Sequence, residues 1–557
     1  MPTIPNFPPL VTFVLFRYAS VIIPLVSQWL YACLLSREQD HDLVLIDQQV
    51  DFAPIEQACA DFRSAAARGT PASHPVPRLV RLLLLQQFYA RSLRECAARL
   101  RYDWLWRWFC GYSLWEPTPS HSTLHRFQSW VREHQPDLCF KAICEQIRAD
   151  CPEEANQPLI GDSFAMRADA AHESRLRRLR HSAQQIERLL GLLPSALAER
   201  ARAALQLESE ALFGDAEEPA EFRLADWRAT TCTSAAACAR WLAALRLLLA
   251  TTLVPTALQQ RLDQLEKILG DEFHLERDES GQVVAATLRQ KEARGSYALG
   301  SATDPAATFG VHGDKPAVLG FNVSIVASAT FIWQVYTATG AEPDAVAIVP
   351  LLQGLYQDSG SFPHKLIYDR AAGTGKLLAD VERATDRQSQ LVARLIDYCA
   401  RSERFGPADF TLSQDGLSLT CPNKVQTERR YRAGAHTQAW QFRFSASQCE
   451  GCPLWAQCRD RNAQPDGYRT VTLSDHRDVR QQAQAYQHSD AFKADMRLRP
   501  LVERPIACLV RYHGARRATA RGLAAADFQV KGAAIAFNLR VWLKLIRQRD
   551  KSPPAAA

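Results

Sequence analysis

Hydrophobic and polar positions change their spacing along the chain, and each spacing predicts a different kind of element. Residues 77–150 carry leucines and aromatic residues three and four positions apart, which predicts short amphipathic helices with Arg and Gln on the exposed face. The spacing breaks at Gly111 and restarts after two prolines, where Thr118, Ser120 and Ser122 each offer an N-cap. Such helices are compatible with a helix-turn-helix and, equally, with a plain helical bundle.

After residue 157 the pattern changes to short apolar runs. The run "PLIGDS" ends at Asp162, and helical spacing then extends over residues 173–275, which predicts a helical hairpin inserted into another domain. The runs "AVLGFNVSIVAS" and "TFIWQVYTATG" predict a β-hairpin. Farther on, "EPDAVAIVPLLQGLYQ" predicts a helix, "HKLIYDRAAG" a short buried strand and "LADVERATDRQSQLVARLIDYCARS" a second helix. This succession predicts a mixed α/β sheet.

Composition adds a basic segment to this picture. The chain has 557 residues, enough for about two to four modules, and its 47% hydrophobic and 23% charged residues predict that most of it folds. The net charge is +6, with a pI of about 8.6. Residues 497–521 hold seven Arg and one acidic residue, so this segment carries +6 by itself. Charge concentrated in this way suits phosphate groups.

The N-terminal stretch Phe7–Ser36 is apolar over a membrane-spanning length. Arg17, Pro24 and Gln28 interrupt it, and no basic region precedes it as in a signal peptide. The alternatives are a helix packed on the body of the protein and translated upstream sequence outside the fold, and we expect no membrane partner. Most of the 15 cysteines lie singly in apolar surroundings, which predicts reduced thiols in a cytoplasmic protein.

The segment "HKLIYDRAAGTGK" raises the question of a phosphate-binding loop. That motif requires Gly-x-x-x-x-Gly-Lys-Ser/Thr after a strand. Gly375 and Lys376 fit, but Arg370 stands at the first glycine position and Leu377 at the hydroxyl position. Because two of the four fixed positions fail, an ATP-dependent DNA motor is disfavoured. The segment instead predicts a buried strand that presents Asp369.

Two carboxylates therefore follow apolar strands in one predicted sheet, namely Asp162 and Asp369. A single Asp in such a place is most often a turn or cap residue, whereas paired carboxylates that converge at strand ends can hold divalent metal ions. Glu503, the lone acid of the Arg-rich segment, is the best candidate for a third ligand. Its alternative role is that of a salt-bridge partner for the surrounding arginines.

These three acids, in this order and context, resemble those of the DDE transposases of bacterial insertion sequences. "IGDSFAMRADA" and "LIYDRAAG" resemble the strands that carry the first and second Asp, and "TDPAATFGVHGDKPAVLGFNVSIV" resembles the strand region between them. "RLRPLVERPIACLVRYHGARRATARG" resembles the final helix, with Arg499 four residues before Glu503. "LLLLQQFYARSLRECAARL" resembles the helical front domain of these proteins. The resemblance covers roughly residues 77–545.

The resemblance implies a ribonuclease-H-like core in which Asp162, Asp369 and Glu503 are catalytic and hold two Mg²⁺ (or Mn²⁺) ions about 3.5–4 Å apart. It implies double-stranded DNA as the partner, both the terminal repeats of the element and the target DNA. A homodimer would cleave and join this DNA. The protein would lie in the bacterial cytoplasm, associated with the nucleoid. The alternative is a catalytically inactive, transposase-derived DNA-binding protein. The expected DNA contacts, for which a solvated basic face is the alternative, are Arg499, Arg504, Arg511, Arg516, Arg517, Arg521, Lys376 and Arg126.

A cysteine cluster lies between the second and third acids. "CEGCPLWAQC" holds Cys449, Cys452 and Cys458, and Cys421 lies upstream in "LTCPNK". This spacing predicts a structural Zn²⁺ site, since four thiolates close a tetrahedral coordination sphere, and Gly451 permits the tight turn between the first two. A reduced loop with free thiols is the alternative.

The expected fold class is α/β, with a ribonuclease-H-like mixed sheet, an all-helical N-terminal domain, a helical insertion and a small Cys-rich zinc-binding insertion. Seven segments follow from the patterns and the resemblance. They are an apolar segment and linker (1–76), a helix-turn-helix-like DNA-binding domain (77–150), the first core strand (155–172), a helical insertion (173–300), the catalytic core strands and helices (301–400), the Cys-rich insertion (401–490), and the catalytic Glu helix with the C-terminal helices (491–550).

Overall fold

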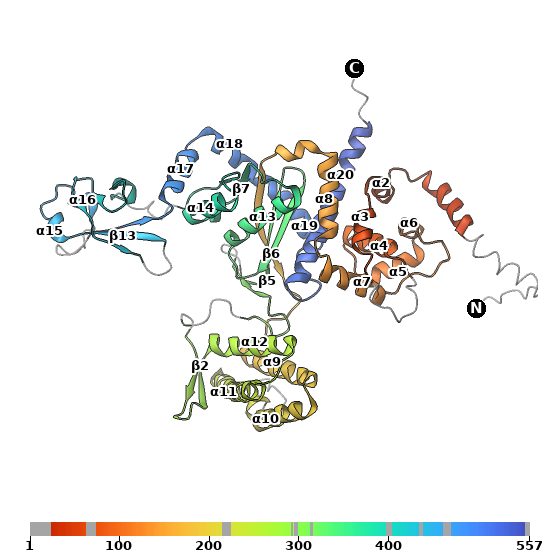
Figure 1. Ribbon diagram of the computed structural model, residues 1–557. Coiled ribbons are helices and arrows are strands. Elements are labelled where there is room, and N and C mark those ends of the chain that lie inside the picture. Colours follow the sequence, from red (N-terminus) through yellow and green to blue (C-terminus); the bar gives the residue numbers. More distant parts are fainter. Residues whose placement is uncertain are drawn as a thin grey trace, which may run out of the picture.

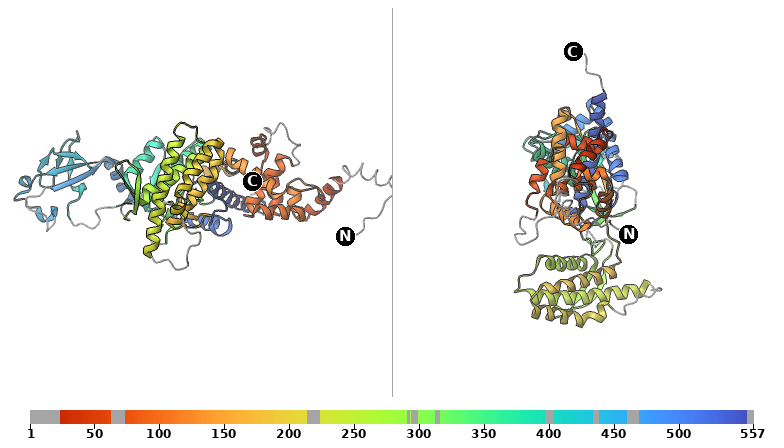
Figure 2. Two further views of the ribbon diagram at one scale, coloured as in Figure 1. Left: turned by 90° about the horizontal axis from the view of Figure 1, so that it is seen from below. Right: turned by 90° about the vertical axis from the view of Figure 1, so that its right-hand side faces the viewer.

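The computed structural model describes residues 24–62, 74–213, 224–290, 293, 299–311, 316–396, 404–433, 438–459 and 469–551. A mixed sheet lies at the centre, with the N-terminal helices on one side, a small β-rich unit on the opposite side and a helical insertion below (Figure 1). The right-hand view of Figure 2 shows the insertion as a separate layer. Residues 1–23 and 63–73 are outside the described part, and with them lie most of the apolar N-terminal stretch and part of the expected linker.

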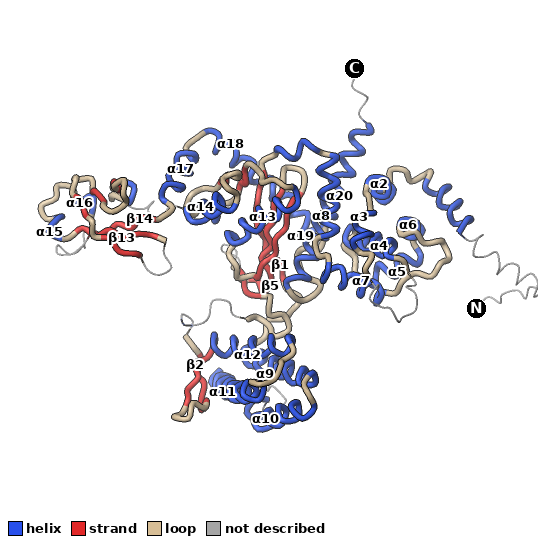
Figure 3. The backbone as a smooth tube through the Cα atoms, viewed as in Figure 1, coloured by secondary structure: helices blue, strands red, loops and turns tan. Residues whose placement is uncertain are grey.

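The central sheet confirms the expected mixed α/β arrangement. Its strand order is β4-β5-β1-β7-β8, with β6 also paired to β5 (Figure 3). The antiparallel part is formed by β1 (Leu159–Arg167), β4 (Thr308–Gly310), β5 (Val318–Ala327) and β6 (Ile332–Thr339). The parallel part adds β7 (Lys365–Ile367) beside β1 and β8 (Gln390–Val392) beside β7. β5 and β6 form the predicted hairpin, and β5 is buried continuously from Gly320 to Ala327, as expected of a strand paired on both edges.

In the described part of the chain, the helices before the sheet include α2 (Asp42–Gln49), α3 (Ala53–Ala58), α4 (Val76–Phe88), α5 (Leu93–Tyr102), α6 (Trp104–Phe109), α7 (His121–His134) and α8 (Leu138–Asp150). Of these, α2, α5, α6 and α7 begin at side-chain caps. Ser92 and Glu95 form a capping box at α5, and Ser120 accepts a hydrogen bond from the Thr123 amide at α7. The C-terminal helix α20 (Leu523–Lys551) packs on α4, α8 and β6, so these helices share one hydrophobic core with the sheet.

The described part of the apolar N-terminal stretch is a helix, Pro24–Leu35, which packs on the body of the protein. The Tyr31 hydroxyl donates to the Tyr112 carbonyl at 2.8 Å, and the Leu114 amide donates to Ser27 Oγ at 3.2 Å. One described helical segment, Trp227–Leu249, is apolar and long enough to cross a membrane, and 56% of its most apolar window is buried within the protein. A core helix of a folded unit shows the same combination.

The insertion is larger than the helical hairpin that the sequence predicted. It contains four helices and a β-ribbon, namely α9 (Arg175–Leu189), α10 (Ser195–Phe213), α11 (Leu224–Leu249), α12 (Thr256–Glu272), β2 (Phe273–Arg277) and β3 (Val283–Leu288), around a core of its own. The last helix ends at Glu272 because the next residues pair as β2 with β3. At its base the Glu173 amide donates to the Gly300 carbonyl at 3.1 Å, and Ser301 Oγ donates to the Glu173 carboxylate at 2.9 Å. The chain therefore leaves the sheet and returns to it at one point.

After β6 the chain forms α13 (Ile348–Ser359), β7, α14 (Gly375–Ala384) and β8. The sequence predicted one long helix over residues 378–402, and that prediction is wrong for residues 385–396, while residues 397–402 lie outside the described part of the chain. Asp386 and Arg387 have positive φ angles of 47° and 58° and turn the chain, after which residues 390–392 pair with β7. Strand pairing has overridden a helical pattern there.

A small β-rich unit follows, with six phenylalanine, leucine and valine side chains as its core. Its elements are β9 (Thr411–Leu412), β10 (Leu419–Thr420), β11 (Gln426–Thr427), β12 (Arg430–Arg432), β13 (Ala439–Phe444), α15 (Ala446–Cys449), α16 (Trp455–Cys458) and β14 (Arg469–Ser474). The chain then returns to the sheet through α17 (Arg477–Gln487), α18 (Asp490–Leu498), the 3₁₀ turn η7 (Arg499–Val502) and α19 (Glu503–Tyr512).

Candidate active site

The register between β1 and β7 places two of the predicted acids side by side. The two strands run parallel, with Leu159 opposite Leu366 and Ile160 opposite Ile367. Asp162 and Asp369 each come two residues after the second pair. Both carboxylates therefore leave neighbouring strands at the same level of the sheet.

The position of Asp162 within its strand differs from the prediction. The sequence placed it at a strand end, but β1 continues to Arg167 because residues 160–167 stay paired with β5. Asp369 does follow the end of its strand, where it caps the short 3₁₀ turn η5 (Arg370–Ala372). The Ala371 amide donates to Asp369 Oδ1 at 2.9 Å.

Arg499 links the third acid to the first. Its Nη2 donates to Asp162 Oδ2 at 2.9 Å and its Nη1 donates to Glu503 Oε1 at 3.1 Å. The Asp162 side chain is only 17% exposed, whereas the side chain of Glu503, the first residue of α19, is 65% exposed. The site is thus closed toward the sheet and open toward the helix, and one guanidinium bridges two of its carboxylates.

A fourth acid, Asp344, faces the same site and was not predicted. It begins the 3₁₀ turn η4 (Asp344–Ala347), which contacts η5, and Asn322 Nδ2 on β5 donates to Asp344 Oδ1 at 2.6 Å. Burial raises the pKa of Asp162 and of Asp369, and the charge of Asp344 raises both further. In the sequence Asp344 follows a proline at the start of a helical run, which indicates only a helix start.

Two packing features fix the strand that carries Asp369. Lys365 Nζ on β7 donates to Asp495 Oδ2 on α18 at 2.9 Å, and the Tyr486 hydroxyl on α17 donates to the same oxygen at 2.5 Å. This network ties β7 to the helices that lead to Glu503. On the other side, the fully buried ring of Tyr368 lies so close to Gly161 that a Cβ there would be 2.3 Å from Tyr368 Cε2.

The donor set of this site fits a divalent cation in its chemistry, because carboxylate oxygens are the ligands that Mg²⁺ and Mn²⁺ prefer. The positions of these side chains do not yet form a metal-coordination sphere. In the described part of the chain, no group of three or more His, Cys, Asp or Glu side chains is placed to hold a metal ion. The positive charge between Asp162 and Glu503 is that of Arg499.

The predicted cationic residues fall into three groups. Arg504, Arg511 and Arg516 are exposed along and just after α19. Arg517 pairs with Asp169 at 3.3 Å, and Arg521 Nε donates to the Asp169 carbonyl at 3.3 Å. Two lie elsewhere: Lys376 pairs with Asp380 at 2.6 Å on α14, and Arg126 is exposed on α7.

The residues after Asp369 serve helix α14 and the sheet. Thr374 accepts a hydrogen bond from the Leu377 amide and caps α14, which begins at Gly375. A Cβ at Gly373 would meet the Arg394 carbonyl oxygen at 1.9 Å, so the glycine permits close packing against the chain after β8. The glycines of this segment therefore have packing and capping roles, and the phosphate-loop interpretation is not needed.

The four predicted zinc ligands meet in the β-rich unit. Cys421, Cys449, Cys452 and Cys458 line one cavity of about 30 Å³, and Gly451 makes the expected turn with a φ angle of 68°. Burial raises the pKa of the Cys449 thiol, and the three other thiols raise it further. The thiols nevertheless do not form a metal-holding group among the residues described. All cysteines in the described ranges are free.

Two family comparisons match the chain at its two ends. A transposase domain (DUF772) matches residues 33–130, which include α2 to α6 and most of α7. A transposase DDE domain matches residues 420–543, which include the four cysteines, Arg499, Glu503 and most of α20. No curated protein and no solved structure matches the chain. Because α20 packs on the front helices as well as on the sheet, both matched regions belong to one folded core, and together they identify the protein as a DDE transposase of an insertion sequence.

Proposed function

We propose that this transposase cleaves and joins DNA at the ends of its own mobile element, and that Asp162, Asp369 and Glu503 are its catalytic residues. The observation that carries the proposal is the register of β1 and β7, which sets Asp162 beside Asp369, together with the link from Asp162 through Arg499 to Glu503. The strand order β6-β5-β1-β7-β8 agrees with the ribonuclease-H-like core that the resemblance implies.

In this proposal the three carboxylates would hold two Mg²⁺ or Mn²⁺ ions. Such ions, when bound, lower the pKa of an attacking water and stabilise negative charge on phosphate oxygens. The sheet holds Asp162 and Asp369 in place, whereas Glu503 is exposed at a helix start and is free to adjust. Arg499 keeps the carboxylates from repelling one another, and its planar guanidinium suits a DNA phosphate once it turns from Glu503.

The test is nicking of a supercoiled plasmid that carries the DNA flanking the gene, with Mg²⁺ or Mn²⁺. Asp369→Asn removes a charge without changing the shape of the side chain and should lower the nicking rate by about 10³-fold, since several kcal/mol of transition-state stabilisation are lost. Asp478→Asn on α17, an exposed carboxylate whose side chain is 85% exposed, is the matched control. Nicking by Asp369→Asn at the wild-type rate would refute the catalytic assignment. A wild-type protein that binds DNA but nicks with neither metal would be the inactive DNA-binding alternative.

Asp344 has a positioning role in the same proposal. Its negative charge lies beside Asp162 and Asp369 and favours a cation between them. Asp344→Asn should raise the Mg²⁺ concentration for half-maximal nicking several-fold and change the maximal rate little. An unchanged Mg²⁺ requirement would contradict this role.

We also propose that Cys421, Cys449, Cys452 and Cys458 bind one structural Zn²⁺ after a small rearrangement of the thiols. Their shared cavity and the Gly451 turn support this proposal. Metal analysis of purified protein tests it, and absence of zinc with rapid alkylation of Cys449 and Cys452 would contradict it. We propose further that the protein acts as a homodimer on paired element ends and is associated with the nucleoid. The mass of the protein–DNA complex tests the homodimer.

A further inference from the structure

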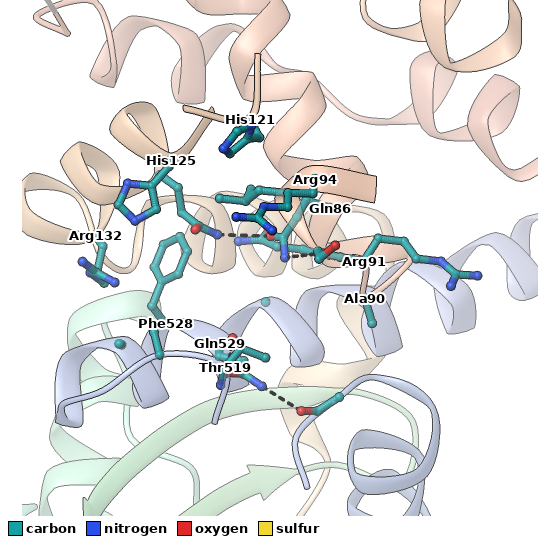
Figure 4. Close-up of a pocket in the computed structure, with 18 of the residues that line it drawn as sticks. Gln86, Ala90, Arg91, Arg94, His121, His125, Arg132, Thr519, Phe528 and Gln529 are labelled. Carbon is teal, nitrogen blue, oxygen red and sulfur yellow. Dashed lines mark hydrogen bonds between the residues drawn. The ribbon is translucent and has the colours of Figure 1, made fainter. Parts of the chain in front are cut away.

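A cleft of about 760 Å³ lies between the N-terminal helices and the segment that joins α19 to α20. One wall comes from α4, the turn before α5, and α7, and the other comes from residues 513–533. Figure 4 shows Arg91, Arg94 and Arg132 on the first wall, with Phe528 and Gln529 on the second. The cleft is therefore built from both regions that match transposase domains, apart from Arg132 just beyond the first of them.

The lining of the cleft is strongly basic. Four arginines line it, together with three histidines, and no Asp or Glu is among the lining residues. Arg91 reaches Glu95 only at 3.8 Å. Arg94, Arg126 and Arg132 have no acidic partner in the described part of the protein, and Arg94 and Arg126 are exposed. The cleft therefore concentrates uncompensated positive charge, which attracts an anionic ligand.

The polar groups of the walls are mostly prearranged, and one of them lacks a partner. Gln128 Nε2 donates to Gln86 Oε1 at 3.3 Å, and Gln529 Nε2 donates to the Gly514 carbonyl at 2.8 Å. Gln87 is 7% exposed, lines the cleft and has no hydrogen-bond partner at Oε1. This buried acceptor can be satisfied by a water molecule but not by a phosphate diester, which carries no donor, so the case for an anionic ligand rests on the arginines.

The second wall of the cleft is joined directly to the active site. Residues 513–521 follow α19, and their backbone is tied to β1: Arg167 N donates to the Arg516 carbonyl at 3.1 Å, and Ala518 N donates to the Arg167 carbonyl at 2.8 Å. α19 has 10 residues, so its far end lies about 15 Å from Glu503. At about 3.4 Å per base pair, that distance corresponds to about four to five base pairs of duplex DNA.

We propose that this cleft, whose second wall begins about four to five base pairs from Glu503, holds the phosphate backbone of duplex DNA, and that Arg94, Arg126 and Arg132 are its phosphate contacts. The inference rests on the proposed function and extends it, because it assigns a second DNA-binding surface formed jointly by the front helices and the α19–α20 connection. Arginine supplies charged, forked donors that suit phosphate oxygens. Phosphate contacts position the duplex without reading its sequence.

The experiment measures binding of full-length protein to a short duplex of arbitrary sequence in EDTA, so that cleavage plays no part. The test variant replaces Arg94, Arg126 and Arg132 together with Gln. We expect its Kd to rise about 10- to 100-fold and the slope of log K against log salt to fall by about 2.7, or 0.9 for each of three phosphate contacts. The corresponding triple Lys variant keeps the charge and should retain most of the slope.

The control replaces Arg177, Arg188 and Arg200 with Gln, which removes the same charge from exposed positions on α9 and α10. Equal weakening of binding by the control would overturn the proposal, because net charge alone would then explain the effect. Unchanged duplex affinity and salt slope in the test variant, with a wild-type melting curve, would also overturn it and is the result expected if the cleft receives an acidic protein. The proposed cleavage activity is tested by a different result: absence of nicking by the wild-type protein would refute the activity without bearing on DNA binding in the cleft.

Discussion

Replacing Gly161 with alanine should damage the protein at its candidate active site, because the added methyl group has no room. Its Cβ would lie 2.3 Å from Cε2 and 2.5 Å from Cδ2 of Tyr368, a side chain with no exposed surface. Ordinary carbon–carbon contact begins near about 3.5 Å, so the ring or its strand must move by about 1.2 Å. Overpacking of a filled core costs about 1–3 kcal/mol of unfolding free energy.

The displacement also reaches two of the proposed catalytic residues. Tyr368 directly precedes Asp369, and Gly161 directly precedes Asp162. A shift of about 1 Å in a catalytic group can lower a rate about 100-fold. Denaturant unfolding and plasmid nicking should therefore both show the defect in Gly161→Ala.

Gly270 provides the matched control. It lies in α12 with nothing within 4 Å of an added Cβ, so Gly270→Ala should raise stability by about 0.5–1 kcal/mol and leave nicking unchanged. Wild-type stability and nicking in Gly161→Ala would refute the argument that Tyr368 fixes the spacing of the two acids.

Three further predictions concern charged groups. Burial raises the pKa of Asp369 above its unfolded value, so the stability that this carboxyl contributes is present at low pH and is lost as pH rises through the folded pKa. Asp369→Asn should therefore raise the melting temperature at neutral pH in EDTA. An unchanged or lower melting temperature would count against this reasoning. Burial, and to a smaller extent Arg540, lowers the pKa of His513 from about 6.5 to about 4, so the free energy of unfolding should fall by up to about 3 kcal/mol as pH drops across that range. In unfolding curves measured at several pH values, His513→Gln should flatten this fall. A fall in the variant as large as that of the wild type would disprove the prediction. Lys365→Met leaves the Asp495 carboxylate without its cation and should lower the free energy of unfolding by about 1–3 kcal/mol, as measured with denaturant. The double variant Lys365→Met/Asp495→Leu should lose less stability than this single variant. A larger loss in the double variant would contradict the prediction.

The strands of the sheet were predictable where their local pattern agreed with their pairing. The hairpin of β5 and β6 carries β-branched and aromatic runs on both strands, and the strand before Asp369 is a short apolar run. β8 was not predictable, because "QLVARL" has helical spacing and becomes a strand only through its pairing with β7. The helical spacing of residues 173–275 predicted helices, but neither their number nor the β2–β3 ribbon.

The candidate site divides in the same way. The order and surroundings of Asp162, Asp369 and Glu503 were visible in the sequence, as was the offset of Arg499 from Glu503. Asp344 was not, because its place beside the other acids depends on Asn322 of β5 and on the contact between η4 and η5, which no local pattern encodes. The basic cleft was missed for the same reason, since its walls are nearly 400 residues apart in sequence.

The two ends of the helical insertion meet at the edge of the sheet, which affects how well the protein tolerates a shortened or replaced insertion. Glu173 binds the backbone and side chains of residues 300–302, so the two ends of the insertion meet. A segment with joined ends and its own hydrophobic core can be exchanged for a short turn without stretching β1 away from its neighbours. The insertion is therefore a modular part, and versions of this transposase with the segment shortened or replaced are expected to keep a folded central sheet.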